Sequence, residues 1–223
     1  FDAIKMIKKE LNGRVPLIGF AGAPWTLLCY MVQGKGSKTF DEAKSFCYTQ
    51  PEVAHHLLQM ITDTTIAYLK GQIEAGADVV QIFDSWGGLW SPVDFEEFSL
   101  QYIRQIVHAV KDLAPTIVFA KGAWASIGAM ADTGAAGLGI DWCIPPKTAR
   151  EFAGNNITLQ GNFDPAKLYA PVDVIRREVK KMITDFGPGR YIANLGHGIL
   201  PTVPVDSARA FVDTVKEFDY STL

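Results

Sequence analysis

Short apolar runs alternate with longer amphipathic segments along the whole chain. Six of these runs are short and have no clear polar face, which is typical of parallel strands buried on both sides. They predict strands at residues 17–21, 78–83, 116–120, 138–141, 158–161 and 191–195. The segments between them have helical periodicity, so the pattern predicts an α/β fold.

The longest intervening segment, residues 51–75, is predicted to be a crossover helix that ends before Gly76. Its larger apolar residues fall on or near one stripe: Val53, Leu57, Met60, Ile61, Tyr68 and Ile73. A second helix begins with Ser91 as N-cap and Pro92 at the first position. Its apolar stripe comprises Phe95, Phe98, Tyr102, Ile106, Val110 and Leu113. The turn at residue 23 leads into a helix, and further helices are predicted at residues 125–132, 146–152, 172–186 and 205–218.

Strands that alternate with helices can form an open doubly wound sheet or a (β/α)8 TIM-type barrel. No GxGxxG turn favours the first of these. Polar residues follow nearly every predicted strand, as in barrel enzymes, namely Asp84, Ser85, Lys121, Asp141, Asn162, Asp164, Asn194 and His197. We therefore expect one β/α-barrel domain over residues 1–223, with about six βα units and the N-terminal units missing.

Composition narrows the class of protein. Hydrophobic residues make up 48% and charged residues 20% of the chain, as in ordinary globular proteins. The net charge is -3 and no run of Lys or Arg exceeds two residues, so we expect neither nucleic-acid nor membrane partners. The spacings of Cys29, Cys47 and Cys143 match no metal motif or disulfide framework, and a reducing cytoplasm is the simplest setting.

Two motifs stand out, GFAGAPWTLLCYMVQG at residues 19–34 and ANLGHGILP at residues 193–201. The small residues of the first would let a flat ligand approach the backbone. Tyr30 could donate a hydrogen bond to a carboxylate there, although by spacing alone a core tyrosine is the better interpretation. His197 stands between two glycines at a strand end, where a histidine is usually functional.

Both motifs, together with QIFDSWGG at residues 81–88 and LQGNFDP at residues 159–165, closely resemble the uroporphyrinogen decarboxylase family. The resemblance implies removal of the acetate carboxyl groups of a tetrapyrrole, uroporphyrinogen, without a cofactor or metal. It also implies a cytoplasmic homodimer. Carried over to this chain, the substrate-binding residues are Phe20, Tyr30, Phe83, Ser85 and His197.

The family's N-terminal segment, with a PxWxMRQAGR-like motif, has no counterpart in these 223 residues, and the first residue is Phe1. The resemblance places the pyrrole-binding aspartate and the arginines in that segment, so the catalytic groups are unknown here. We expect a fragment or a partly observed chain that is inactive alone, and a non-catalytic piece of such a barrel is the alternative.

A related family of zinc-dependent corrinoid methyltransferases has the same barrel and a His-x-Cys pair. The corresponding stretch here, FAKGAWASIG at residues 119–128, contains neither ligand type, and a barrel of this kind without zinc is the weaker alternative. The three cysteines are expected to be small buried hydrophobic residues. Helical histidines 55, 56 and 108 are expected on the surface or in packing.

Three strand-end polar residues have competing interpretations. Asp84 is expected to hold loop geometry by accepting backbone N–H groups, rather than to take part in catalysis. Asp164, followed by Pro165, is expected to be a helix N-cap. For Lys121, contact with an anionic side chain of the substrate and hydrogen bonding within the rim loops are equally supported.

Overall fold

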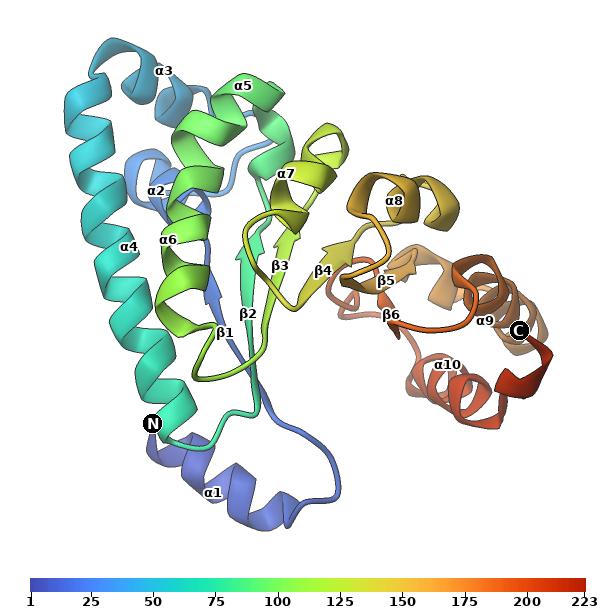
Figure 1. Cartoon of the computed structure of the whole chain (residues 1–223). Coiled ribbons are helices and arrows are strands. Elements are labelled where there is room, and N and C mark those ends of the chain that lie inside the picture. Colours follow the sequence, from blue (N-terminus) through green and yellow to red (C-terminus); the bar gives the residue numbers. More distant parts are fainter. The chain divides into compact units, whose positions relative to one another are not determined.

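A computed structural model describes all residues 1–223 (Figure 1). The chain divides into two compact units, Phe1–Gly137 and Leu138–Leu223, and each is described by itself. In both units parallel strands alternate with helices, which confirms the α/β prediction. The expectation of one domain over residues 1–223 stays a prediction. No helix combines the length and apolar character needed to cross a bilayer.

Three parallel strands form the centre of the first unit, and they lie side by side in chain order. They are β1 (Ile18–Gly22), β2 (Val79–Asp84) and β3 (Thr116–Ala120). Phe20 pairs with Gln81, and Phe83 pairs with Phe119. Strand order therefore follows chain order here, as in a β/α barrel, because a doubly wound sheet reverses its strand order at a switch point.

Seven α-helices surround or extend these strands: α1 (Asp2–Leu11), α2 (Pro24–Gln33), α3 (Asp41–Thr49), α4 (Pro51–Glu74), α5 (Pro92–Phe95), α6 (Gln101–Val110) and α7 (Ile127–Ala131). Shorter turns complete the unit, namely the 3-10 helices η1 (Gly87–Leu89) and η3 (Trp124–Ser126) and the π-helical turn η2 (Glu96–Leu100). Helices α1 and α3 have no counterpart among the predictions.

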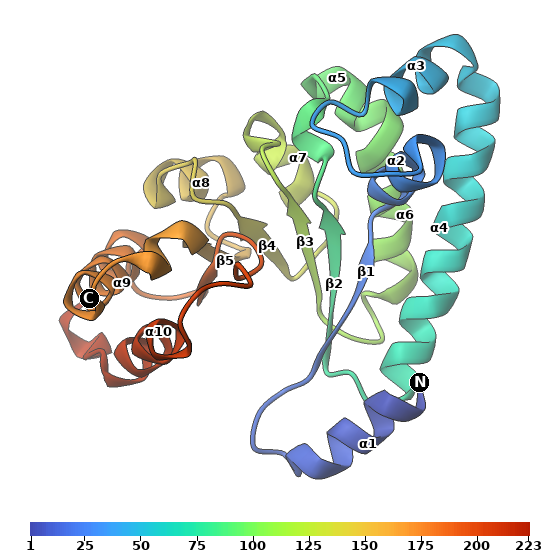
Figure 2. The same ribbon diagram turned by 180° about the vertical axis from the view of Figure 1, so that it is seen from behind.

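The long helix α4 packs against α2, α3 and α6, as the view from behind also shows (Figure 2). Its predicted length is confirmed to within one residue, but of its predicted apolar stripe only Ile61 is buried. The side chains of Val53, Met60 and Tyr68 are more than half exposed. The buried face contains the aliphatic residues Leu58, Ile61 and Leu69 together with small or polar residues, namely Ala54, Thr62, Thr65 and Gln72. Small side chains on this face allow the neighbouring helices to approach α4 closely.

The predicted start of the helix after β2 is confirmed. The Ser91 side chain accepts a hydrogen bond from the backbone N–H of Asp94 at 3.2 Å, and Pro92 occupies the first turn. The helix then widens into the π-helical turn η2 before it continues as α6. It ends at Val110, and Leu113 is exposed rather than part of the buried stripe.

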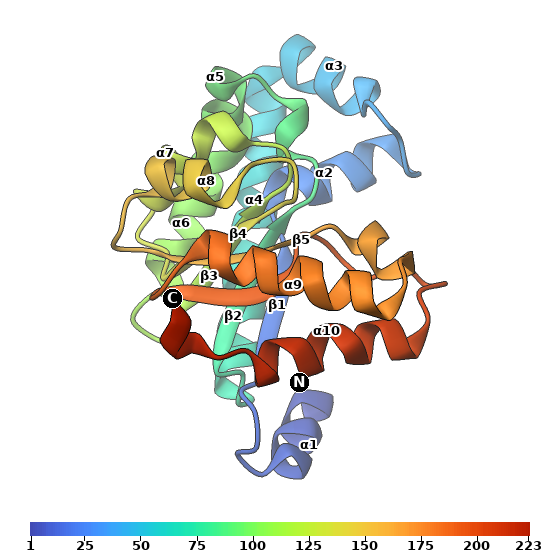
Figure 3. The same ribbon diagram turned by 90° about the vertical axis from the view of Figure 1, so that its right-hand side faces the viewer.

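The second unit contains the strands β4 (Gly137–Ile140), which starts at the boundary, β5 (Thr158–Phe163) and β6 (Tyr191–Leu195), again in chain order. Its helices are α8 (Pro146–Ala153), η4 (Pro165–Tyr169), α9 (Val172–Phe186), α10 (Val205–Glu217) and η5 (Tyr220–Thr222). Helices α9 and α10 run side by side (Figure 3). They bury one cluster with β5, which includes Phe163, Ile175, Val179, Ile183 and Phe211.

All six predicted strands are confirmed to within two residues at either end. Burial on both faces holds for β3 and β4, in which every residue is buried. It is wrong for β1 and β6, where burial alternates along the strand and Ile18, Phe20 and Ile192 are exposed. The side chains on one face of each of these two strands are therefore only partly covered by other elements.

Candidate functional site

Four of the five predicted site residues lie in the first unit, on β1, near the end of α2, and at the carboxyl end of β2. Phe20 lies on β1 and its ring is 61% exposed. Phe83 lies on β2 and meets Phe20 edge to face, with ring centroids 5.8 Å apart. The Phe83 ring also meets Phe119 of β3 at 5.9 Å. These three rings form an aromatic row across neighbouring strands.

Tyr30 is not a core residue, because its side chain is 45% exposed. Its hydroxyl oxygen accepts a hydrogen bond from the indole Nε1–H of Trp86 at 2.9 Å. Phe40 packs between these two residues, 5.9 Å from the Tyr30 ring and 4.7 Å from the Trp86 ring. The hydroxyl proton of Tyr30 therefore remains available for donation to a ligand.

Ser85 follows the last residue of β2 and is half-buried. The adjacent loop backbone is fixed by Trp25, whose indole N–H donates to the Trp86 carbonyl oxygen at 3.1 Å. The Gly88 N–H donates to the Lys121 carbonyl oxygen at 2.9 Å. The loop that carries Ser85 is thus held from both sides.

Asp84, the last residue of β2, is fully buried beneath this loop. Its two oxygens accept separate hydrogen bonds, from the Thr26 hydroxyl and from the Ser99 hydroxyl, each at 2.6 Å. Burial raises the pKa of Asp84 to about 6, against the opposing effects of Ser99, Thr26 and the Trp86 backbone N–H. Asp84 thus has structural surroundings, as expected, but its main donors are the Thr26 and Ser99 hydroxyls and not the backbone N–H groups that the sequence predicted.

The fifth predicted residue, His197, lies in the second unit, directly after β6. It is exposed, and both neighbours are glycines. A Cβ on Gly196 would lie 2.9 Å from the Trp142 backbone nitrogen, so the chain approaches another backbone closely there. This loop places an imidazole at a strand end, as the sequence predicts.

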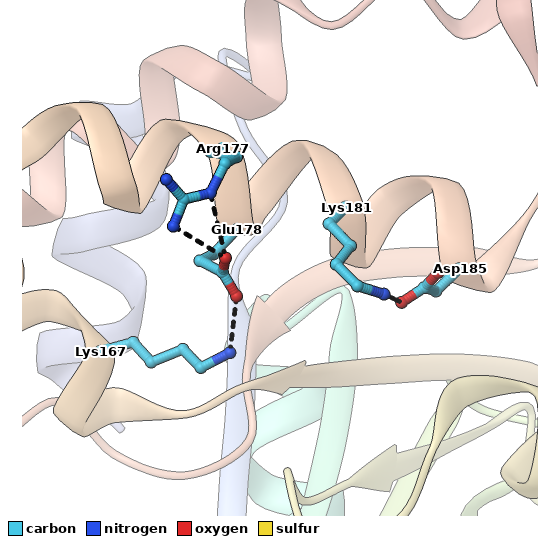
Figure 4. Close-up of polar contacts among 5 residues, drawn as sticks. All are labelled: Lys167, Arg177, Glu178, Lys181 and Asp185. Atoms are coloured by element: carbon cyan, nitrogen blue, oxygen red, sulfur yellow. Dashed lines mark hydrogen bonds and ion pairs between the residues drawn. The ribbon is translucent and has the colours of Figure 1, made fainter.

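The second unit also contains a cavity of about 310 Å³ between the end of β5, the start of α8 and one side of α9. Four of its five charged lining residues form ion pairs, and the fifth is Asp164 (Figure 4). Lys167 Nζ lies 2.9 Å from Glu178 Oε2, Arg177 contacts the other oxygen of Glu178, and Lys181 pairs with Asp185. Since each lining lysine has an anion beside it, this cavity has no unpaired positive charge to attract an acidic ligand.

The sequence matches the model of one family, described as uroporphyrinogen decarboxylase (URO-D), over residues 1–218. The uroporphyrinogen decarboxylase of Christiangramia forsetii is 61% identical over 218 residues, covering 98% of this chain and 64% of that protein. The chain belongs to the uroporphyrinogen decarboxylase family. The human uroporphyrinogen decarboxylase is 48% identical over 223 residues, covering 96% of this chain and 61% of that protein.

The chain therefore spans about two thirds or less of the length of these curated family members. Among solved structures, a methyltransferase from Methanosarcina mazei superposes with a TM-score of 0.85 at 26% identity. The match covers 97% of this chain and 63% of the methyltransferase. A B12-independent methionine synthase from Shewanella has a TM-score of 0.67 at 10% identity, covering 96% of this chain and 64% of that chain, which is a likeness of fold alone.

The capping aspartate and the helical histidines occupy the structural positions that the sequence predicts. Asp164 caps η4, because its side chain accepts from the Ala166 N–H at 2.9 Å. His55 stacks on Phe98 and its Nδ1 lies 2.7 Å from the Tyr102 hydroxyl, while His56 and His108 are exposed. These assignments confirm the cap and the structural histidines.

The cysteine prediction is confirmed in part. Cys29 and Cys47 are buried, and burial raises the pKa of both thiols, that of Cys47 to about 12. Cys143 is exposed, so its assignment as a buried hydrophobic residue was wrong. Cys143 lies in the turn after β4, where its backbone N–H donates to Asp141 Oδ1 at 2.8 Å. This turn leaves the thiol on the surface. No group of three or more His, Cys, Asp or Glu side chains is positioned to hold a metal ion.

Trp86 is the site residue that the sequence predictions missed. It links the Tyr30 hydroxyl to the loop after β2, although it is separated from Tyr30 by 56 positions. The sequence offered one signal, because Trp86 lies inside the QIFDSWGG motif that carries Phe83 and Ser85. Its partner could not be found from spacing, because the contact depends on how α2 lies against the end of β2.

Proposed function

We propose that the protein containing this chain is a uroporphyrinogen decarboxylase, which converts uroporphyrinogen III to coproporphyrinogen III with release of CO2. Membership of the family at 61% identity over 98% of the chain carries this proposal. The exposed Phe20 ring and the Tyr30 hydroxyl support it, because they offer an apolar surface and a hydrogen-bond donor to a ligand.

The proposed reaction requires a place for the electron pair of the C–C bond that breaks when an acetate side chain loses CO2. Protonation of a pyrrole carbon makes the ring a cation, which accepts this electron pair. A proton then replaces CO2 on the side-chain carbon and leaves a methyl group, and the ring carbon releases the first proton, so that each acetate consumes one proton overall. The protein must donate the first proton, stabilise the cation and orient the acetate, and the substrate itself serves as the electron sink, so no cofactor is required.

We assign the substrate-binding roles to five residues. The rings of Phe20 and Phe83 pack against the pyrrole rings, while Tyr30, Ser85 and His197 donate hydrogen bonds to the acidic side chains. Two observations support these roles: Phe20 is 61% exposed and the oxygen of Tyr30 already accepts a bond, which directs its own proton outward. The proton donor and the group that stabilises the cation are not assigned to any of the five.

The test is an anaerobic assay with uroporphyrinogen III, in which the porphyrins formed after oxidation are separated by the number of carboxyl groups. A purified protein that contains this chain and is as long as its relatives should convert uroporphyrinogen, with eight carboxyl groups, into coproporphyrinogen, with four. A parallel assay of residues 1–223 alone tests the expectation that they are inactive. If the longer protein forms no product with fewer carboxyl groups, the proposed function is wrong.

Methyl transfer is the second candidate, and the match to the methyltransferase from Methanosarcina mazei favours it. Two observations weigh against it, namely the lower identity of 26% and the absence of a His-x-Cys pair after β3. Demethylation of a methylated corrinoid by the purified protein, without decarboxylation of uroporphyrinogen, would favour this candidate. The cytoplasmic location, the homodimer, and the absence of nucleic-acid and membrane partners stay predictions.

A further inference from the structure

One buried carboxylate joins three separate segments of the first unit. Asp84 ends β2, Thr26 lies in the first turn of α2, and Ser99 lies in the π-helical turn η2. Each hydroxyl donates to a different oxygen of Asp84 at 2.6 Å. Thr26 and Ser99 are also buried, so water does not compete for these bonds.

Hydrogen bonds connect Asp84 and Thr26 to the residues assigned to substrate binding. The Thr26 hydroxyl oxygen lies 3.4 Å from the backbone N–H of Trp86, which donates to it. The Trp86 indole then donates to the hydroxyl oxygen of Tyr30 at 2.9 Å. Asp84 is thus connected to Tyr30 through two hydrogen-bonded residues, and it directly precedes Ser85 in the chain.

The protonation state of Asp84 gives these bonds a direction. Because the pKa of Asp84 is about 6, the carboxylate is mostly ionised at neutral pH and can only accept. The Thr26 hydroxyl proton therefore points at Asp84, which leaves its oxygen lone pairs for the Trp86 N–H. A carboxylate that is fully buried does not touch substrate, so its effect on the reaction must act through the residues that it holds.

We propose that Asp84 is a positioning residue for the decarboxylation: through Thr26 and Ser99 it fixes the loop of Ser85 and Trp86, and through Trp86 the hydroxyl of Tyr30. The inference rests on the proposed function and adds to it a residue with no substrate contact. Misplacement of binding groups by about 1 Å can lower a rate about 100-fold. The loss of one of the hydroxyl donors should therefore reduce catalysis by more than its effect on stability explains.

The decisive variant is Thr26→Val, which keeps the shape of the side chain and removes the hydroxyl. Thr62→Val is the matched control, since Thr62 is also buried, but its hydroxyl donates only to the Leu58 carbonyl within α4. At pH 7.5 we expect Thr26→Val to lower kcat/KM for uroporphyrinogen about tenfold, and Thr62→Val to change it less than twofold. Thr26→Ser, which keeps the hydroxyl, should restore kcat/KM to within about twofold of the parent.

A second measurement does not depend on activity. Hydrogen exchange of the peptide that contains residues 83–90 should become at least about fivefold faster in Thr26→Val and stay unchanged in Thr62→Val and Thr26→Ser. Equal exchange and equal kcat/KM in the two valine variants would overturn the inference. An inactive parent protein would instead refute the proposed function, and the exchange data would still decide whether Thr26 and Asp84 hold the loop.

Discussion

At the scale of single residues, burial gives Asp84 a predictable effect on stability. Its pKa in the folded chain is about 6, above the ordinary value of 3.8. Between these two values the folded chain binds more protons at this site than the unfolded chain does, so the free energy of unfolding falls as pH rises. A shift of this size corresponds to a loss on the order of 3 kcal/mol, complete above about pH 6.

We predict that Asp84→Asn removes this pH dependence. Asparagine cannot ionise, so its contribution to stability should be nearly constant between pH 4 and pH 7. Urea unfolding of the parent and the variant at four pH values measures the difference between them. Asp112→Asn, at an exposed position, is the control and should leave the difference constant. If the difference in free energy of unfolding between parent and Asp84→Asn did not change with pH, as expected for the control, burial would not raise the pKa of Asp84.

Tyr30 and His197 allow a direct test of the binding roles. In a protein that contains this chain and is as long as its relatives, Tyr30→Phe and His197→Ala should each lower kcat/KM for uroporphyrinogen by about one to two orders of magnitude. The basis is the roughly 1.5–3 kcal/mol that a hydrogen bond to a charged group contributes. Tyr68→Phe, which removes a hydroxyl from a half-exposed ring on α4, is the control and should have no effect. A variant that unfolds but keeps normal turnover at low temperature would identify its residue as structural.

At the scale of elements, close contact between two loops holds the end of β2 against the end of β3. Gly88 in η1 donates to the Lys121 carbonyl oxygen at 2.9 Å, and the Lys121 N–H donates to the Asp84 carbonyl oxygen at 3.1 Å. A Cβ on Gly88 would lie 2.5 Å from that Lys121 oxygen and 2.7 Å from Gly122 Cα. Both neighbours are backbone atoms, so a side chain here must displace a loop.

We predict that Gly88→Ala lowers the free energy of unfolding by about 1–3 kcal/mol, the usual range for an overpacked position. Gly36→Ala is the matched control, because a Cβ there would meet nothing within 4 Å. Thermal unfolding should show a lower Tm for Gly88→Ala, by roughly 2–4 °C for each kcal/mol in a chain of this size. Equal Tm values for the two alanine variants would show that the β2 and β3 loops can separate without loss of stability.

Helix periodicity and capping residues predicted most elements but not their details. Ser91 and Pro92 correctly marked a helix start, because an N-cap acts through bonds within four residues. The π-helical turn that contains Ser99 was not predictable from local sequence. Its buried hydroxyl bonds to Asp84, which lies 15 positions away on a strand. The buried face of α4 was mispredicted for a similar reason, since the neighbouring helices select its small side chains.

At the scale of the whole molecule, the core of the second unit is formed by its own residues. The cluster around Ile175, Val179 and Ile183 contains residues of β5, η4, α9 and α10, all within Leu138–Leu223. A local core of this kind can support a separately cooperative part of the chain. A core mutation in the second unit should therefore destabilise that unit more than the first.

We predict that Ile183→Ala, at a fully buried position, lowers the free energy of unfolding by about 2–5 kcal/mol. Hydrogen exchange should accelerate in peptides of the second unit and remain slow in those from β1 to β3. Val212→Ala, on α10 and 45% exposed, is the control and should leave both regions unchanged. Equal acceleration in both units would show that the chain unfolds as one cooperative body.

We also predict that activity does not depend on a metal ion. The chemistry proposed here uses the substrate as electron sink, and the stretch after β3 lacks the His-x-Cys pair of the zinc methyltransferases. Treatment with a chelator followed by gel filtration should leave the rate of decarboxylation unchanged. Zinc bound at one equivalent per chain, with activity lost on its removal and restored on its return, would contradict this prediction.

The sequence by itself determined the order and type of the main elements, because buried strands, amphipathic helices and their caps depend on residues close together in the chain. It also indicated Phe20, Tyr30, Phe83, Ser85 and His197, since each lies in a compact motif. Only the tertiary structure decided how these motifs are held. The bonds of Asp84 with Thr26 and Ser99, and of Trp86 with Tyr30, join positions 15 to 58 residues apart. Such contacts depend on the packing of α2 and η2 against the strand ends, which no local pattern specifies.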